Sequence, residues 1–329
     1  TSFIFSFIDL GYQLNQEDKF LQMYDLSFDA SVHCYTLPLT VGGCIYTIPT
    51  NEVKYLYAYK LMKEQGLTFI KMPPSTITYL QPYFSKINLD NLKYTLFGGE
   101  ALPVNLSIKW QKCAPNSEIH NVYGPTEATI NCFYYKSTKE NKTFNNIICI
   151  GKPIGDTQAI VIDENTNILA TNQKGELCVS GDQITNGYWK NSEKNEDSFF
   201  ELEYNNQHLT FYKTGDLVYF DEELDYFYCG RIDNQVQIQG YRVELGELEH
   251  HARNKTNINH VAAISLLNDN GTNQLYLFTE NYTDSIDDLK SYLTEKVPNY
   301  MVPQKIINIP AFPLSTSGKI DRSKLKEFI

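Results

Sequence analysis

The sequence contains no run of eighteen apolar residues, so it offers no helix that could cross a membrane. Its seven cysteines include no Cys-x-x-Cys pair, which argues against zinc and favours free thiols in a reducing compartment. Basic residues are also scarce, and a net charge of -11 argues against nucleic-acid or anionic-membrane binding. The first residues include neither Met nor the basic stretch of a secretory signal. We therefore expect a cytoplasmic protein.

The composition is that of a folded chain, with 42% hydrophobic and 20% charged residues. A length of 329 residues is enough for one large domain and a small one. An acidic protein can still bind a nucleotide, because local hydrogen-bond donors decide that.

The periodicity changes within residues 230–251. Residues 235–239 alternate polar and apolar side chains, which predicts a strand with one solvated face. Gly240 breaks this pattern, and residues 244–251 take up helical spacing with acidic residues in the first turn, where the helix dipole favours them. The segment therefore predicts a connection from a strand to a helix.

Helical and strand-like patterns alternate over residues 1–148, which favours an α/β sheet with its ligand edge at the carboxyl ends of the strands. Residues 149–232 contain short strand patterns and frequent turn signals, which predict a β-rich subdomain. Residues 233–329 again mix strand and helix patterns, with a helix expected over about 285–296.

A Gly-Pro turn carries the most specific chemical signal, in the stretch Asn121-Val-Tyr-Gly-Pro-Thr-Glu127. A hydroxyl and a carboxylate placed directly after a tight turn suit a phosphate group with its Mg²⁺. The ring of Tyr123 offers a face for a nucleotide base, and the Asn121 side chain can hydrogen-bond to an amino group on the edge of that base. The stretch therefore indicates a nucleotide site.

Eight segments resemble, in the correct order, the motifs of adenylate-forming enzymes, in particular the amino-acid adenylation domains of nonribosomal peptide synthesis and the D-alanine:carrier-protein ligases. These segments are Phe28–Ser31, Gly98–Pro103, Asn121–Ala128, Gly175–Gly181, Asn186–Trp189, Tyr212–Asp216, Gly230–His251 and Ser315–Arg322. The resemblance implies a large α/β lobe with a β-rich subdomain and a small mobile α+β C-terminal lobe. Asp233 would be the hinge between them.

The resemblance also assigns roles around a bound nucleotide. Lys319 and Thr126 would be catalytic, and Glu127 would hold Mg²⁺. The residues expected to bind the nucleotide are Gly99, Glu100, Ala101, Asn121, Tyr123, Gly124, Thr126, Asp216, Tyr228 and Arg231. A carboxylate at Asp216 suits the ribose hydroxyls, because it can accept two hydrogen bonds at once.

A second set of residues is implied to bind an amino acid. Asp29 would pair with its α-amino group, and the side-chain pocket would consist of Ala30, His33, Lys71, Leu96, Gly98, Val122, Ile130 and Asn131. Lys71 interrupts an apolar strand, and a cation flanked by Asn131 and His33 suits a carboxylate or carboxamide. We therefore expect Asp, Asn or Glu as substrate, with D- or L-alanine as the second choice.

The sequence departs from the family pattern in two places. It lacks the Ser/Thr/Gly-rich phosphate loop that ends in a lysine (TSGTTGxPKG), so it is expected to correspond to the back two-thirds of such an enzyme. Gln237 replaces the lysine found in most relatives, and Gln239 stands where arginine is common. Gln237 lacks the positive charge with which a lysine could stabilise a developing oxyanion. Transfer of the activated acyl group to a thiol acceptor is therefore less secure than formation of the adenylate.

The function that the resemblance implies is a ligase that uses ATP and Mg²⁺ to activate an amino acid as aminoacyl-AMP. The acyl group would then pass to the phosphopantetheine thiol of a carrier protein. An acyl-CoA ligase is one alternative, although Asp29 argues against it because fatty and aryl acids have no amino group to pair. A non-catalytic carrier-binding module is the other. The missing phosphate loop and Gln237 favour that module, and four intact residues oppose it: Glu127, Asp216, Arg231 and Lys319.

Overall fold

The structure is a computed structural model and describes residues 2–232, 235–258, 260–268, 272–314 and 320–329. It divides into two compact units, residues 1–232 and 233–329. Within the described residues, no helix combines the length and the apolar character needed to span a membrane. The seven cysteines all carry free thiols, and five of them are buried.

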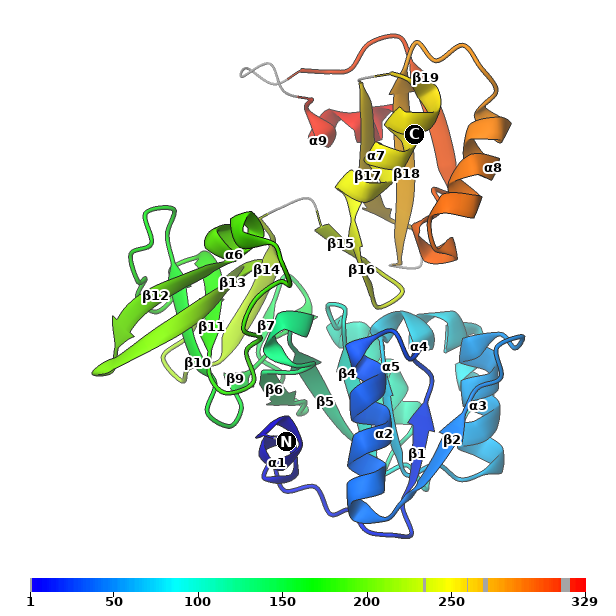
Figure 1. The fold of residues 1–329 in the computed structure, drawn as a ribbon. Helices are drawn as coiled ribbons and strands as arrows, with labels where there is room; N and C mark the ends of the chain where they lie inside the picture. Colours follow the sequence, from blue (N-terminus) through cyan, green and yellow to red (C-terminus); the bar gives the residue numbers. More distant parts are fainter. Residues whose placement is uncertain (1, 233–234, 259, 269–271, 315–319) are drawn as a thin grey trace. The chain divides into compact units, whose positions relative to one another are not determined.

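Seven strands form the main sheet of the first unit, in the order β2-β1-β3-β4-β5-β6-β9 (Figure 1). Their bounds are β1 Lys19–Gln22, β2 Cys44–Thr47, β3 Phe69–Met72, β4 Tyr94–Gly98, β5 Glu118–Tyr123, β6 Phe133–Lys136 and β9 Lys152–Pro153. Strands β1 to β5 pair in parallel, whereas β6 and β9 are antiparallel. The carboxyl ends of β3, β4 and β5 therefore share one edge of the sheet.

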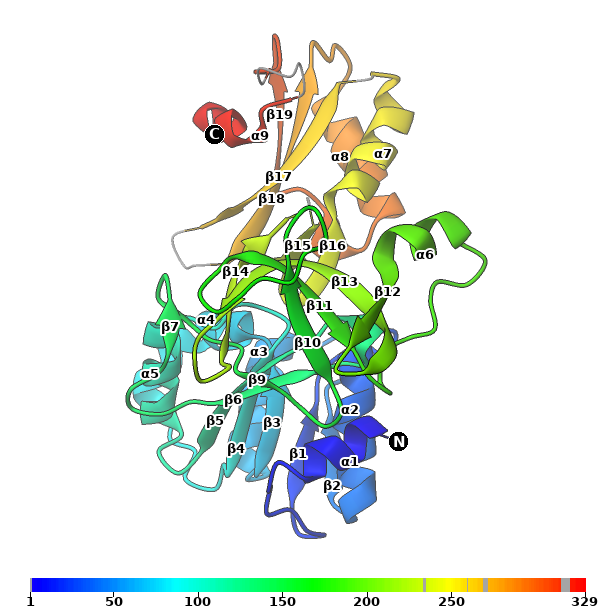
Figure 2. The same cartoon turned by 90° about the vertical axis from the view of Figure 1, so that its left-hand side faces the viewer.

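Helices cover both faces of this sheet (Figure 2). They are α1 Ser2–Ile8, α2 Asp29–Val41, α3 Lys54–Glu64, α4 Pro74–Leu80 and α5 Val104–Cys113, with short 3₁₀ turns η1 Gln81–Lys86 and η2 Thr126–Ala128. Successive side chains of a strand point to opposite faces, so Phe20 packs with α1 and α2 whereas Leu21 packs with α3, α4 and α5. Helix α2 ends because Gly42 takes a left-handed φ of 75°.

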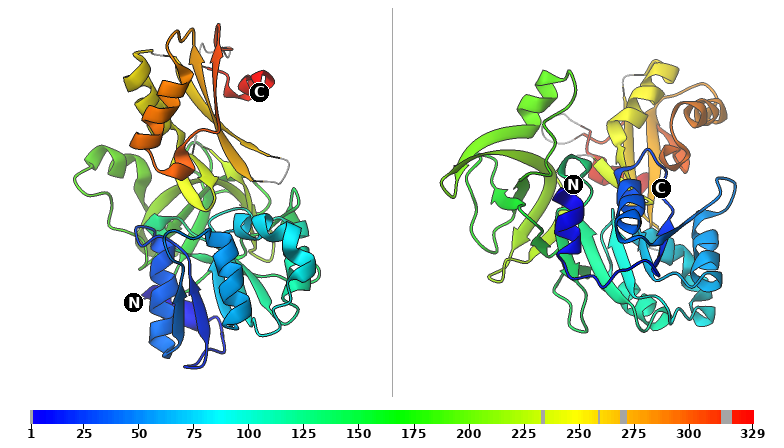
Figure 3. Two further views of the ribbon diagram at one scale, coloured as in Figure 1. Left: turned by 90° about the vertical axis from the view of Figure 1, so that its right-hand side faces the viewer. Right: turned by 60° about the horizontal axis from the view of Figure 1, so that its bottom comes forward.

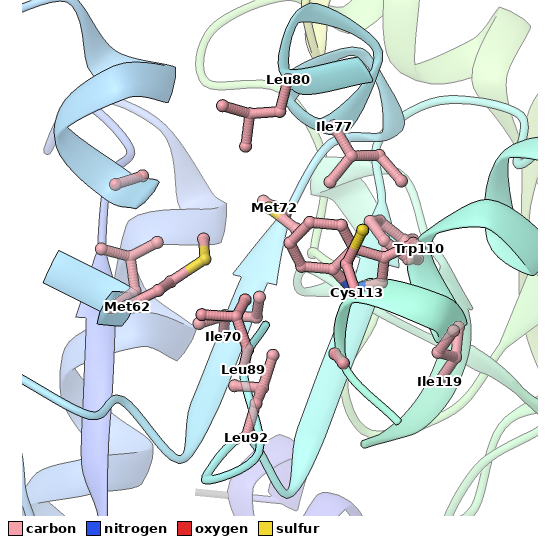
Figure 4. Packing of buried hydrophobic residues seen from close by; sticks show 14 of the residues in the cluster. Met62, Ile70, Met72, Ile77, Leu80, Leu89, Leu92, Trp110, Cys113 and Ile119 are labelled. Atoms are coloured by element: carbon pink, nitrogen blue, oxygen red, sulfur yellow. The ribbon is translucent and has the colours of Figure 1, made fainter. Parts of the chain in front are cut away.

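The larger core of the first unit lies between the sheet and helices α3, α4 and α5 (Figure 4). Trp110 is fully buried there, close to Met72 and Ile77. Its indole nitrogen donates a hydrogen bond to Thr95 Oγ1 at 3.2 Å, which satisfies the polar atom of the ring. Burying one such side chain stabilises the fold by about 1.5–3 kcal/mol, so this layer fixes the strands that lead to the ligand edge.

A β-rich part follows in the same unit. Its strands are β10 Gln158–Ile162, β11 Gly175–Ser180, β12 Phe199–Tyr204, β13 Gln207–Phe220 and β14 Tyr226–Arg231, with a small hairpin of β7 Thr143–Phe144 and β8 Ile147–Ile148, and helix α6 Ser192–Ser198. The order is β10-β11-β13-β12, and β14 pairs with β13. All these pairs are antiparallel.

The second unit holds a three-stranded sheet, β17-β18-β19, and a separate hairpin (Figure 3). Its elements are β15 Gln235–Ile238, β16 Tyr241–Glu244, α7 Leu245–Thr256, β17 Val261–Leu267, β18 Asn273–Glu280, α8 Ile286–Lys296, η3 Asn299–Met301, β19 Lys305–Ile309, α9 Arg322–Leu325 and η4 Lys326–Phe328. Helices α7 and α8 pack on one face of the sheet, and α9 packs on the other. Helix α8 begins where the Ser285 hydroxyl accepts from the Asp288 amide.

The predicted α/β class is confirmed, with a parallel sheet, a β-rich part and a small mixed unit. One local prediction was wrong. A direct connection from a strand to a helix was expected after Gly240, but Tyr241–Glu244 form strand β16, and the helix begins at Leu245. Gln239 and Gly240 both have positive φ (52° and 83°), which makes the tight turn of a β-hairpin rather than a break before a helix.

Candidate functional site

The candidate site of the first unit is built on the carboxyl ends of β4 and β5. Two glycines there have no room for a side chain. A Cβ at Gly98 would lie 2.9 Å from a Val122 methyl, and a Cβ at Gly124 would lie 2.7–2.8 Å from backbone atoms of residues 130–132. Gly99, the next residue after β4, is exposed and has a left-handed φ of 80°. Neighbouring protein atoms therefore require glycine at positions 98 and 124, and the exposed backbone of Gly99 is the part of this edge on which a flat ligand can lie.

One buried carboxylate joins this edge to the β-rich part. The Tyr123 hydroxyl donates to Asp216 Oδ2, and Arg231 Nη1 donates to Asp216 Oδ1 at 3.0 Å. The antiparallel register of β13 and β14 places Asp216 opposite Arg231, which also donates to the Thr214 carbonyl at 2.8 Å. Burial, and then the charge of Asp216, raise the pKa of Tyr123 well above its usual value. The phenol is therefore a neutral donor that orients the carboxylate.

Two further predicted nucleotide residues, Glu100 and Asn121, bond to the protein backbone. The Glu100 carboxylate accepts from the backbone amide of Ser75 in the first turn of α4, at 2.8 Å. The Asn121 amide donates to the carbonyls of Ile148 (3.3 Å) and Cys149 (2.9 Å). Both side chains thus hold neighbouring backbone in place, which the sequence reasoning did not anticipate.

The other residues of the nucleotide set have different degrees of exposure. Ala101 and Thr126 are exposed, and Tyr228 on β14 is half-buried. Lys319, predicted to be catalytic, and Asp233, the predicted hinge, lie outside the described residues. The structure therefore describes the predicted nucleotide-binding residues, all of which lie in the first unit, but neither Lys319 nor Asp233.

The predicted Mg²⁺ residue, Glu127, lies in the 3₁₀ turn η2 and is half-buried. Its carboxylate accepts a hydrogen bond from the Tyr188 hydroxyl at 2.5 Å. Sequence reasoning named the Asn186–Trp189 motif but gave Tyr188 no role, and nothing in the spacing indicated this contact across the fold. Among the described residues, no group of three or more His, Cys, Asp and Glu side chains could enclose a metal ion.

The predicted amino-acid residues gather on the α2 side of the same sheet. Asp29 and Ala30 stand half-buried in the first turn of α2. The apolar members lie in the core beneath that helix: Leu96, Val122 and Ile130. Lys71 stands beside Leu96 in the register of β3 and β4. The strand order and the α2 start therefore bring the predicted set together.

Lys71 is the unusual member of this set, because its side chain is only 3% exposed. Its ammonium group donates to His33 Nδ1 at 3.1 Å and lies 3.3 Å from Asn131 Oδ1. Within the described chain, no carboxylate forms an ion pair with Lys71. Desolvation therefore lowers its pKa from 10.5 to about 8, although the nearby Cys34 and Asp29 act in the opposite direction.

The two side chains that bond to the Lys71 amine, His33 and Asn131, are uncharged. Burial, and then the positive charge of Lys71, lower the pKa of His33 well below its usual value. Burial raises the pKa of the Cys34 thiol to about 12. If His33 Nδ1 accepts from Lys71, the ring proton is on Nε2, which is buried without a hydrogen-bond partner among the described atoms. The cluster thus holds a buried cation with polar but uncharged contacts.

Comparisons with known proteins agree with this geometry. Residues 1–189 match the family described as AMP-binding enzyme. The chain is 32% identical over 318 residues to tyrocidine synthase 3 of Brevibacillus parabrevis, covering 96% of this chain and 5% of that protein. It is 30% identical over 328 residues to the D-alanine–D-alanyl carrier protein ligase of Bacillus cytotoxicus, covering 95% of this chain and 63% of the ligase.

Solved structures give the same relationship. The chain is similar to the Vibrio cholerae adenylation domain AlmE in complex with glycyl-adenosine-5'-phosphate, with a TM-score of 0.87 and 26% identity. The match covers 99% of this chain and 61% of AlmE. The chain therefore spans no more than 63% of the length of any of these three relatives.

Proposed function

The chain belongs to the AMP-binding enzyme family, as its motifs predicted, and on that premise we propose that the whole protein is an amino-acid-adenylating ligase. It uses ATP to convert an amino acid to aminoacyl-AMP with release of pyrophosphate, and then transfers the aminoacyl group to the phosphopantetheine thiol of a carrier protein with release of AMP. The observation that carries this proposal is the Asp216 carboxylate held by Tyr123 and Arg231 beside the glycine edge of the sheet. A carboxylate fixed in this way suits the ribose hydroxyls of a nucleotide.

The donor set fits ATP with Mg²⁺. Mg²⁺ usually takes one or two carboxylates and completes its shell with phosphate oxygens and water. One carboxylate at Glu127, next to the exposed hydroxyl of Thr126, matches that pattern. The absence of a larger acidic or histidine cluster among the described residues is consistent with an ion that arrives with the nucleotide. When bound, the ion would neutralise phosphate charge, and Glu127 would hold it in place.

The remaining assignments follow the same proposal. Residues 1–148 and 149–232 form the large lobe, and residues 233–329 form the C-terminal lobe. Lys319 stabilises the charge shared by carboxylate and phosphate, and Asp233 is the hinge. The buried oxygen of Gln237 has no hydrogen-bond partner among the described atoms, and the residue carries no charge, so transfer to the thiol is the weaker half of the proposal.

The substrate that this pocket suits is a small amino acid with an acidic or amide side chain: Asp, Asn or Glu. Lys71 is buried and has hydrogen-bond contacts, but among the residues that the structure describes it has no carboxylate partner, which is costly for a charged ammonium. A substrate carboxylate would supply the missing charge, while Asp29 would hold the α-amino group. The likeness to the D-alanyl carrier protein ligase favours alanine as the second candidate.

The test is amino-acid-dependent exchange of pyrophosphate into ATP, with the complete protein and each common amino acid plus D-alanine. We expect exchange with one or a few small polar amino acids. Exchange with none of them would overturn the enzymatic proposal in favour of a non-catalytic module. Coenzyme-A-dependent activation of fatty or aryl acids would overturn it in favour of an acyl-CoA ligase.

Lys71→Leu tests the substrate class separately. One polar contact in a pocket contributes about 1–3 kcal/mol of discrimination, so preference should move towards apolar amino acids by about 5- to 150-fold. If the wild type prefers alanine or a large aliphatic residue and Lys71→Leu leaves that ranking unchanged, Lys71 is structural only.

A further inference from the structure

Glu127 is bonded twice by one distant segment, residues 185–188 of the β-rich part. The Tyr188 hydroxyl donates to Glu127 Oε1 at 2.5 Å, and the backbone amide of Thr185 donates to the Glu127 carbonyl at 2.8 Å. Both the side chain and the main chain of Glu127 are therefore held by the same short stretch.

Tyr188 is itself fixed independently of Glu127. The Asn195 side chain of α6 accepts from the Tyr188 amide at 2.6 Å and donates to the Tyr188 carbonyl at 3.1 Å. The preceding Gly187 has φ 122°, and a Cβ there would lie 2.9 Å from the Asn195 oxygen, so only glycine allows this approach. The Tyr188 ring packs edge-on against Phe199, with ring centroids 6.1 Å apart.

This arrangement has a chemical use beyond packing. A phenol that donates to a carboxylate makes a charge-assisted hydrogen bond and fixes the orientation of the carboxylate oxygens. Mg²⁺ demands near-ideal octahedral geometry, so a carboxylate ligand with one orientation binds it better than one that rotates. Partners that hold a ligand in this way are worth about 10- to 100-fold in metal affinity.

We propose that Tyr188 is a positioning residue, whose hydroxyl holds the Glu127 carboxylate in the orientation that receives the Mg²⁺ of the nucleotide. The inference rests on the proposed function, in which Glu127 is the protein ligand of that ion. Tyr188 itself touches neither the nucleotide nor the metal in this role; it acts through Glu127.

The test is Tyr188→Phe in the complete protein, which removes the hydroxyl and keeps the ring against Phe199. We expect the Mg²⁺ concentration for half-maximal pyrophosphate exchange to rise about 10-fold or more, with the KM of the amino acid unchanged. Calorimetric titration of the nucleotide complex with Mg²⁺ should show the same loss of affinity without turnover. ATP binding measured without Mg²⁺ should be unaltered.

The matched control is Tyr226→Phe. Tyr226 is a buried tyrosine of the same β-rich part whose hydroxyl donates to the Ala159 carbonyl at 3.1 Å. The Tyr226→Phe variant also loses one phenol hydroxyl, and the Mg²⁺ dependence of its pyrophosphate exchange should match that of the wild type. If Tyr226→Phe raises the Mg²⁺ requirement as much as Tyr188→Phe does, the effect is general loosening and the proposal fails.

A second variant shows whether Tyr188 acts through the carboxylate. In a Glu127→Gln background, Tyr188→Phe should change the Mg²⁺ dependence no further; an additional 10-fold loss would refute the pairing. A wild type that exchanges normally, together with a Tyr188→Phe variant of equal Mg²⁺ dependence, would refute this inference alone. A wild type that exchanges with no amino acid would instead refute the proposed function.

Discussion

Replacing Lys71 by methionine should change how the stability of the first unit depends on pH. Lys71 is 3% exposed, and within the described part of the chain its amine contacts His33 and Asn131 rather than a carboxylate. Methionine has a similar length and no charge, so the substitution removes the buried ammonium with little change in volume. It also removes the donor to His33 and Asn131, which should cost about 1–3 kcal/mol.

The sign follows from the two pKa values of Lys71. The ordinary value of 10.5 applies to the unfolded chain, whereas burial lowers the pKa to about 8 in the folded unit. Between these values the unfolded chain holds more protons, so raising the pH stabilises the folded wild type. Below pH 8 both states are protonated and the full penalty applies, which is about 3 kcal/mol at about 1.4 kcal/mol per tenfold change.

The variant lacks this penalty at every pH. At pH 7 the gain of about 3 kcal/mol is offset in part by the lost hydrogen bonds, so Lys71→Met should be about as stable as the wild type or slightly more stable. By pH 10 most of the wild-type penalty has gone. The free energy of unfolding of the variant relative to the wild type should therefore fall by about 2–3 kcal/mol between pH 7 and pH 10.

Urea unfolding followed by tryptophan fluorescence measures this difference. The two tryptophans, Trp110 and Trp189, both lie in the first unit, so their emission reports on the unit that contains Lys71. The control is Lys112→Met, which removes an exposed lysine of α5 in that unit. Other groups titrate over the same range, but they do so in both proteins and cancel in the difference. A difference between Lys71→Met and wild type that stays constant from pH 7 to pH 10 would refute the reasoning.

Two further substitutions test the fold around the site. Lys142→Met should lower the free energy of unfolding by about 1–3 kcal/mol in urea titrations, because it leaves three carboxylates without their shared cation. Its ammonium bonds to Asp221, Asp225 and Glu223 at 2.6–2.8 Å, and acid pH should abolish the difference once these groups are protonated. Gly124→Ala should cost about 1–3 kcal/mol in the same assay, because its Cβ would lie 2.7–2.8 Å from backbone atoms of residues 130–132.

Local patterns were enough to predict the fold class and several individual elements of the fold. The helix expected over about 285–296 is α8, and its capping serine and acidic first turn are both readable in the sequence. The alternation over residues 235–239 is strand β15. Strand β16 was missed because four residues are too few to separate strand from helix periodicity, and its identity comes from pairing with β15 across a tight turn.

The resemblance to family motifs was enough to name Glu127 and Asp216 as expected ligand-binding carboxylates, and these roles stay predictions. Their protein partners come from tertiary placement. Tyr188 reaches Glu127, and Tyr123 reaches Asp216, only because the β-rich part packs against the turn that follows β5.

This distinction explains why the unexpected contacts all link segments that lie far apart in the sequence. The Lys71 amine contacts His33 from α2 and Asn131 from the turn after η2. No periodic sequence pattern links residues that lie so far apart in the chain. The charge of a side chain is fixed by its identity, whereas its cost or usefulness depends on the solvent and partners around it. A buried lysine with uncharged contacts and a carboxylate held by a distant phenol are therefore properties of the fold. A pH titration reports on the first, and a Mg²⁺ titration tests the role proposed for the second.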